Sequence, residues 1–233
     1  MLSAHLTDLL VTIVAAILAI TLHEAAHAFA AKALGDDTAQ RMGRLSLNPL
    51  RHVDRVGTIL LPGALLAVQL LTLGRVAVMF GWAKPVPVNA GCFRYPRQGM
   101  ALVAAAGPAM NFLLAWLAAL ATHATDAMSG EFAMTVGDFL DMFILTNLVL
   151  GLFNLLPIPP LDGGRIVVGL LPEGAARTWA RLERAGIVMV LLFVFLIPLV
   201  LQQFGIAWNP VGDALGDVIP WAYQNVLWLA GHE

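Results

Sequence analysis

Three residues with the chemistry of a metal centre lie close together near the start of the chain. His23, Glu24 and His27 form the pattern His-Glu-x-x-His inside an apolar run that covers residues 9–34. On a helix, residues four apart share a face, so both imidazoles can point at one metal ion. Glu24 is one position further on and can reach a water molecule rather than the metal itself. The spacing is typical of a hydrolytic zinc site.

The surroundings of this motif indicate a membrane protein. The chain is 59% hydrophobic and only 12% charged, a composition typical of integral membrane proteins. Ionisable groups inside a membrane helix are costly, so a cluster of three favours a functional role over a structural one. The net charge of −2 comes with no basic patch, and we expect no nucleic-acid partner.

The same sequence limits the other classes of site and organisation. A single cysteine, Cys92, excludes an internal disulfide and a cysteine-rich zinc site. The first apolar run has no Lys or Arg before it and carries the motif, so we do not expect a cleaved signal peptide. We expect one membrane-embedded metalloprotease domain over residues 1–233, with its catalytic core at about 6–170.

The basic residues predict an orientation. They are absent from the N-terminus, from 122–138 and after 184, and excess Lys and Arg mark cytoplasmic segments. We therefore expect residues 32–97 and 164–184 on the cytoplasmic side of the cell membrane, and the N-terminus on the other. The basic residues are Lys32, Arg41, Arg44, Arg51, Arg55, Arg75, Lys84, Arg94, Arg97, Arg165, Arg177, Arg181 and Arg184.

Apolar segments of about the length of a membrane span fit between these charges. We expect an α-helical integral membrane protein, multi-pass, with about 4–6 membrane helices. Helices are predicted at 6–33, 98–121, 137–156 and 185–204. The tail 207–231 mixes four aromatic residues with two prolines and two aspartates, which favours an interfacial segment, although a further short span is an alternative.

Two kinds of segment do not fit the simple span pattern. Residues 56–73 are apolar but contain Pro62, and a full crossing would place the basic residues after it on the wrong side. We expect a re-entrant helix, or a hairpin with 74–82. Residues 40–48 and 81–89 are interpreted as strands of a small membrane-associated β element on the cytoplasmic side. Alternate prolines in 81–89 would make it an edge strand, or the segment is a plain loop.

A hydrolytic zinc site takes three protein ligands and one water, so one ligand is missing from the first motif. Asp162 is the strongest candidate, because it follows a proline-rich stretch at the cytoplasmic end of the predicted helix 137–156. Its alternative role is to cap the next helix. His52 is predicted to be a solvated loop histidine, with a role close to the substrate or the ligands as the alternative.

These motifs together resemble the site-2 protease family of intramembrane zinc metalloproteases. HEAAH at 23–27 and NLLPIPPLDGG at 154–164 match its two catalytic motifs, and GPAMN at 107–111 resembles its glycine-proline-x-x-asparagine element. LSLNP at 45–49 and GWAKPVPVN at 81–89 resemble compact prokaryotic members without PDZ or CBS domains.

The resemblance implies one Zn²⁺ held by His23, His27 and Asp162, with Glu24 as the catalytic base. It also implies that Asn154 holds the substrate backbone or the developing oxyanion. Asn111 is polar in the middle of a predicted span, so we expect it to make an interhelical hydrogen bond or, as the alternative, to contact the substrate in the active site. The expected reaction is hydrolysis of a peptide bond in or near a transmembrane segment of a membrane protein, at a site towards the cytoplasm.

Two other functions remain open from the sequence. A metal transporter would also place His and Asp in membrane helices, but it would not need a glutamate beside the first ligand, and no internal repeat is visible. A protease-like binding protein without activity would keep the scaffold. The physiological substrate and the oligomeric state do not follow from the sequence.

Overall fold

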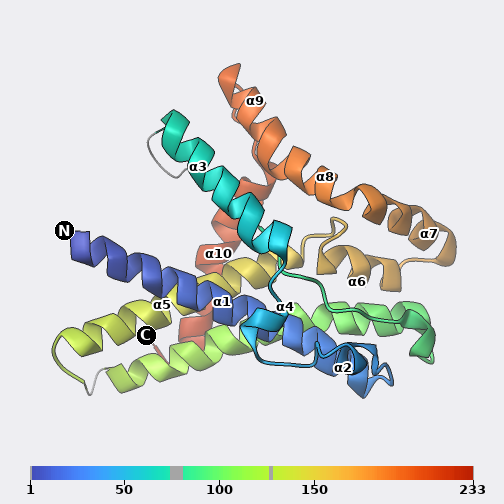
Figure 1. Cartoon of the computed structure of the whole chain (residues 1–233), viewed down its shortest axis with the longest axis horizontal. Helices are drawn as coiled ribbons and strands as arrows, with labels where there is room; N and C mark the ends of the chain where they lie inside the picture. The colour runs from blue at the N-terminus through green and yellow to red at the C-terminus, as the bar shows by residue number, and fades with distance from the viewer. Residues whose placement is uncertain (1, 74–80, 126–127, 233) are drawn as a thin grey trace.

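A computed structural model of the chain describes residues 2–73, 81–125 and 128–232. It is mostly helical, and three of its helices have the length and apolar composition needed to cross a membrane: α1 (Leu2–Ala33), α4 (Pro96–Thr125) and α5 (Glu131–Asn154). They form an antiparallel bundle in which α1 contacts both α4 and α5 (Figure 1). The first three predicted helices are therefore confirmed, with longer bounds than expected.

The ends of these helices follow from backbone chemistry. Gly130 precedes α5 with φ +84°, a conformation that glycine adopts without strain. At the other end, α5 stops at Asn154 and the prolines at 157, 159 and 160 prevent its continuation, as predicted. The chain then turns directly into α6 (Asp162–Leu170).

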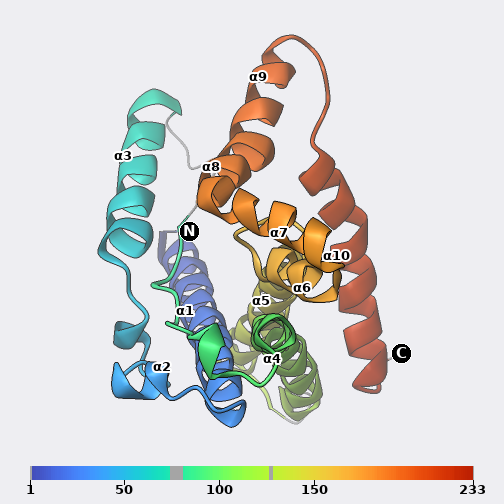
Figure 2. The same ribbon diagram turned by 90° about the vertical axis from the view of Figure 1, so that its right-hand side faces the viewer.

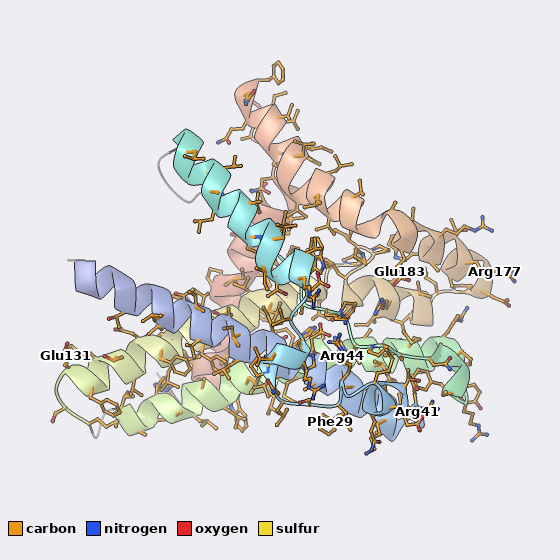
Figure 3. All side chains as sticks on the ribbon, in the orientation of Figure 1. Phe29, Arg41, Arg44, Glu131, Arg177 and Glu183 are labelled. Atoms are coloured by element: carbon orange, nitrogen blue, oxygen red, sulfur yellow. The ribbon has the colours of Figure 1, made fainter. Side chains whose placement is uncertain are left out.

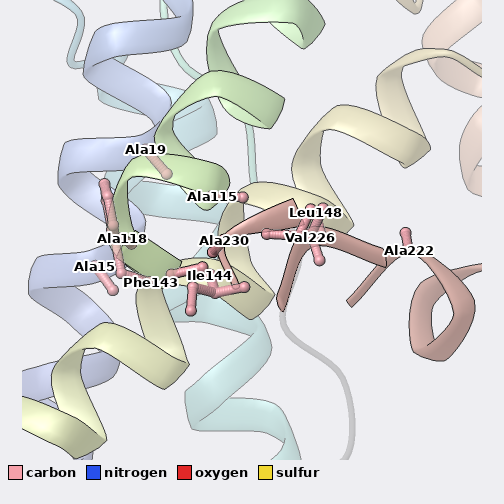
Figure 4. Packing of buried hydrophobic residues seen from close by; sticks show 11 residues of the cluster. Ala15, Ala19, Ala115, Ala118, Phe143, Ile144, Leu148, Ala222, Val226 and Ala230 are labelled. Atoms are coloured by element: carbon pink, nitrogen blue, oxygen red, sulfur yellow. The ribbon is translucent and has the colours of Figure 1, made fainter. Parts of the chain in front are cut away.

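Small residues let the three helices approach closely. Ala15 and Ala19 of α1 and Ala115 of α4 are fully buried against Ile144 and Leu148 of α5 (Figure 4). Alanine allows helix backbones to pack tightly in a membrane, where association depends on close van der Waals contact. This cluster fixes the positions of α1 and α4, which carry most of the candidate site.

Shorter helices surround the bundle. The short helix α2 (Thr38–Arg41) follows α1. Later in the chain, α6 packs on α4, and α7 (Glu173–Arg181) follows α6 (Figure 2). Further on, α8 (Gly186–Val190), a π-helical turn (Leu191–Leu196) and α9 (Ile197–Gln203) continue one another. They occupy the predicted helix 185–204, and its crossing of the membrane stays a prediction.

The C-terminal tail forms one helix, α10 (Pro210–Leu229), which packs against α5 and α4. The Tyr223 hydroxyl donates to the Asp141 carboxylate at 3.1 Å, and the Trp116 indole N–H donates to the carbonyl of Leu229 at 3.3 Å. The tail therefore belongs to the helical bundle, and its depth in a membrane stays a prediction.

The apolar segment 56–73, for which a re-entrant helix was predicted, forms a π-helical turn (Arg55–Leu60) followed by α3 (Leu61–Leu73). Among the described elements, α3 contacts that turn and stands apart from the three-helix bundle (Figure 2). A helical continuation is consistent with the re-entrant prediction but does not test it. Most of the predicted partner segment, 74–80, lies outside the described residues.

The predicted β element is wrong for the residues that the structure describes, which contain no strand. Residues 40–48 hold the end of α2 and turns, including Gly43 at φ +67°. Residues 81–89 form neither helix nor ladder. Pro85 and Pro87 have no N–H, so one side of this segment cannot donate to a neighbouring strand.

The labelled arginines lie toward one end of the bundle (Figure 3). Arg41, Arg44 and Arg177 lie toward the end where α1 finishes and α4 begins, whereas Glu131 lies at the opposite end (Figure 3). This distribution matches the one from which the orientation was predicted.

Candidate metal centre

Three potential ligands converge between α1 and the start of α6. The Nε2 atoms of His23 and His27 lie 3.0 Å apart. The Oδ2 atom of Asp162 lies 3.1 Å from Nε2 of His23 and 3.3 Å from Nε2 of His27. All three side chains are buried, although they come from positions almost 140 residues apart in the sequence. The structure thus brings together the residues that the sequence nominated.

The hydrogen bonds on the far side of each ring define which nitrogen carries the proton. Nδ1 of His27 lies 2.7 Å from the carbonyl oxygen of Val103, which can only accept, so Nδ1 donates. Nδ1 of His23 lies 2.6 Å from Oδ1 of Asn111 and donates to it. In a neutral imidazole the other nitrogen then has a free lone pair. Both Nε2 lone pairs therefore point into the space beside Asp162.

This arrangement fits a zinc ion. Two lone pairs and a carboxylate oxygen would repel one another without a cation, and no hydrogen-bond donor of the described residues reaches Oδ2 of Asp162. Zinc bonds of about 2.0–2.2 Å in a tetrahedral site place neighbouring ligand atoms about 3.3–3.6 Å apart. The observed separations of 3.0–3.3 Å are at or slightly below the lower end of that range. Three protein ligands leave the fourth position for water.

Backbone turns aim Asp162 at the histidines. Asp162 is the first residue of α6, and Leu161 occupies the N-cap position, so the alternative role of Asp162 as the helix cap is not seen. A Cβ atom on Gly163 would lie 2.2 Å from the carbonyl oxygen of Leu155, and one on Gly164 would lie 2.7 Å from the nitrogen of Pro159. Both glycines are needed for the chain to fold back this tightly.

Gly107 makes room for both histidine rings. A Cβ atom at this position of α4 would lie 2.5 Å from Nε2 of His27 and 2.6 Å from Cε1 of His23. In the sequence, Gly107 stood out only as the first residue of the glycine-proline-x-x-asparagine element. The contact with the imidazoles could not be read from the sequence, because it depends on how α1 and α4 cross.

Glu24 lies next to the site and is partly buried. Its Oε2 atom accepts a hydrogen bond of 3.2 Å from the backbone N–H of Val86. Segment 81–89 therefore passes directly beside the carboxylate. Its N–H groups at Trp82 and Lys84 donate to the carbonyls of Gly57 and His52, which attaches the segment to the protein on one side.

A buried carboxylate anchors the other end of this segment. Asp36 is fully buried and accepts from the backbone N–H of Asn89 at 2.6 Å, from the backbone N–H of Thr38 at 3.0 Å and from the Thr38 hydroxyl. Burial alone would raise the pKa of Asp36, but the hydrogen bonds from Thr38 and Asn89 outweigh it and lower the pKa below its usual range. Asp36 is thus ionised at neutral pH. Its role was not predicted from the sequence.

Two asparagines nominated from the sequence lie in different settings. Asn111 is fully buried, and its amide bonds His23 on one side and Asn147 on the other. Asn154, at the end of α5, donates to the carbonyl of Leu150 in its own helix. Asn111 thus contacts His23, one of the candidate ligands, whereas the described hydrogen bond of Asn154 stays within its own helix.

His52 is not the solvated loop residue that was predicted. It is 3% exposed, and its Nε2 donates to the carbonyl of Ser46 at 2.9 Å. Its Nδ1 is buried and has no hydrogen-bond partner among the described residues. The prediction failed because the polar neighbours of His52 in the sequence suggested solvent, whereas in the fold its ring bonds Ser46 and its carbonyl accepts from the distant N–H of Lys84.

Comparison with known proteins matches this chain to a peptidase family and to relatives named as zinc metalloproteases. Residues 123–199 match the family model described as Peptidase family M50. The chain is 41% identical over 191 residues to a Bacillus subtilis protein named "Putative zinc metalloprotease YwhC", with 80% of each chain covered. It is 33% identical over 180 residues to "Putative zinc metalloprotease Rip2" of Mycolicibacterium smegmatis, covering 76% of this chain and 64% of that one. No solved structure matches.

The space at Gly107 gives a direct test of the geometry. Gly107→Ala should weaken zinc binding about 10–100-fold, the range found when groups around metal ligands are disturbed, because the new methyl displaces both imidazoles. Zinc affinity is measured by competition with a chelator on protein purified in detergent. The matched control is Gly137→Ala in α5, where a Cβ atom meets nothing within 4 Å. Equal zinc affinity of the two variants would contradict the geometry.

Proposed function

Because the chain belongs to peptidase family M50, the site-2 protease family, and is a zinc-dependent protease, we propose that it hydrolyses a peptide bond within or near a transmembrane segment of a membrane protein. The observation that carries the proposal is the convergence of His23, His27 and Asp162 on one point within a bundle of apolar helices. We propose these three residues as the ligands of one zinc ion. Family membership also argues against the metal transporter that the sequence left open.

Glu24 is proposed as the catalytic base. A zinc ion at this site supplies Lewis acidity, which activates water and polarises the scissile carbonyl. Glu24 accepts a proton from the attacking water and then donates it to the amide nitrogen as the C–N bond breaks, which yields a carboxylate and an amine. The hydrogen bond from Val86 engages only Oε2, so the other carboxylate oxygen remains for this proton.

The segment 81–89 is proposed to hold the substrate in an extended form. A transmembrane helix hides its carbonyls in hydrogen bonds and must unwind before it can be attacked. N–H groups at 82, 84 and 86 already bond to the protein. In an extended chain the carbonyls of Pro85 and Pro87 would face the other way, so an unwound substrate could donate its N–H groups to them.

Asn154 is proposed to contact the substrate backbone or the oxyanion. Its amide lies at the end of α5, eight residues before Asp162, and donates to Leu150 in its own helix. A rotation about its side-chain bonds would free the N–H groups for a substrate oxygen. For Asn111 we propose instead a role in holding His23, because both ends of its amide are already bonded.

The proposed location is the cell membrane, with the N-terminus outside and the site towards the cytoplasm. The support is the basic residues near the end where α1 finishes, together with the antiparallel course of α1, α4 and α5. The lipid bilayer and a transmembrane protein are the proposed partners. One continuous membrane-embedded domain is proposed for residues 1–233.

Glu24→Gln tests the assignment of the base. The variant should lose about 10²–10⁴-fold in cleavage rate, because an amide cannot take the proton from water. It should keep its zinc, because Glu24 is not among the proposed ligands. Cleavage of a model single-span substrate and zinc content are measured on the same samples, with His23→Ala as the variant expected to lose both. Cleavage by Glu24→Gln at the normal rate would refute the assignment.

Cys92 offers a native probe of the orientation. It is the only cysteine of the chain and it is exposed. A membrane-impermeant maleimide should label it in inverted vesicles and leave it unlabelled in right-side-out vesicles, because the segment 32–97 is proposed to face the cytoplasm. Cys92→Ser gives the background. Labelling of intact right-side-out vesicles would reverse the proposed orientation.

A further inference from the structure

A chain of three buried amide and imidazole groups runs outward from the metal centre into α5. Nδ1 of His23 bonds Oδ1 of Asn111 at 2.6 Å, and Nδ2 of Asn111 donates to Oδ1 of Asn147 at 2.8 Å. Nδ2 of Asn147 donates to the carbonyl of Phe143 at 2.8 Å. Asn111 and Asn147 are both fully buried. These hydrogen bonds therefore connect α1, α4 and α5 in the protein interior.

The carbonyl of Phe143 determines which group donates and which accepts in each of these hydrogen bonds. The carbonyl of Phe143 can only accept, so it must face the NH₂ group of Asn147. Oδ1 of Asn147 then points at Asn111 and must receive the NH₂ group of that residue. Oδ1 of Asn111 is left to face His23, and it can only accept the proton of Nδ1. A backbone carbonyl in α5 thereby selects the tautomer of a histidine in α1.

We propose that Asn147 is a positioning residue for the metal site, which acts through Asn111 to keep the Nε2 lone pair of His23 available. This inference rests on the proposed role of His23 as a zinc ligand. Without Asn147, the amide of Asn111 has no fixed partner for its NH₂ group. It is then free to turn by about half a rotation and to present that group to His23. The imidazole would then carry its proton on Nε2, the nitrogen that is proposed to bind the metal.

The close helix packing around these hydrogen bonds supports a specific arrangement of the side chains. A Cβ atom on Gly151 would lie 3.2 Å from Cβ of Asn111, so the glycine allows α5 to come close at this level. An asparagine in the middle of a membrane helix is costly unless all of its polar atoms are bonded. Asn147 meets that condition through its hydrogen bonds to Asn111 and Phe143, and neither bond reaches one of the three candidate ligands. Its role is therefore indirect.

The test compares four variants with the wild type, and a fifth assigns the NMR signal. Asn147→Leu removes both hydrogen bonds and keeps similar volume. Asn111→Asp replaces the amide by a carboxylate, which can only accept from His23 whichever way it turns. Asn111→Asp/Asn147→Leu combines the two changes. Asn225→Leu is the matched control, because Asn225 also donates to the carbonyl four residues before it in a helix, at 2.7 Å, but far from the ligands.

Zinc affinity is measured by chelator competition, and the tautomer of His23 by ¹⁵N NMR of histidine-labelled, metal-free protein, with His23→Gln to assign the signal. Asn147→Leu should weaken zinc binding about 10–100-fold and move the His23 proton toward Nε2. The double variant should bind zinc nearly as tightly as Asn111→Asp alone, because a carboxylate offers no donor. Asn225→Leu should match the wild type.

Two results would overturn the inference. One is unchanged zinc affinity and tautomer in Asn147→Leu. The other is a double variant as weak as Asn147→Leu, since a loss through packing alone would not be rescued at residue 111. Absence of zinc from the wild type would contradict the proposed function instead, and the NMR tautomer would still decide whether Asn147 sets the proton position of His23.

Discussion

The structure depends on the convergence of three lone-pair donors from α1 and α6 inside an apolar bundle. Two imidazole nitrogens and a carboxylate oxygen approach within 3.0–3.3 Å of one another, in surroundings where uncompensated charge and unpaired polar atoms are costly. A cation satisfies all three at once. Much of the neighbouring architecture can be understood as holding these atoms in place until a metal ion binds.

Helix α4 supplies most of that support. The carbonyl of Val103 and the amide of Asn111 orient the two rings from behind, and Gly107 leaves the space in front of its own backbone for them. These three positions lie on successive turns of one helix, so a single crossing of α4 over α1 sets them together. The alanine contacts among α1, α4 and α5 determine that crossing, which relates membrane packing directly to metal chemistry.

The sequence predicted the long helices, and it nominated the three side chains that the structure brings together, for physical reasons. Apolar runs of span length form helices in a membrane, and His-Glu-x-x-His places two ligands on one helical face whatever the rest of the fold. Asn147 could not be found this way, because an asparagine in an apolar run gives no sign of its partner. His52 and the segment 81–89 were misread since their surroundings come from contacts between distant segments. Alternate prolines suggested a strand, yet the same prolines remove the donors that a ladder needs.

X-ray absorption at the zinc edge of the purified protein would show whether His23, His27 and Asp162 hold the metal. We expect one zinc ion per chain in a four-coordinate shell of nitrogen and oxygen atoms at about 2.0–2.1 Å, with the signature of two imidazoles and no sulfur. In Asp162→Ala the two-imidazole signature should remain while the carboxylate ligand is lost. A shell with fewer than two imidazoles, or one unchanged by Asp162→Ala, would contradict the proposed set of ligands.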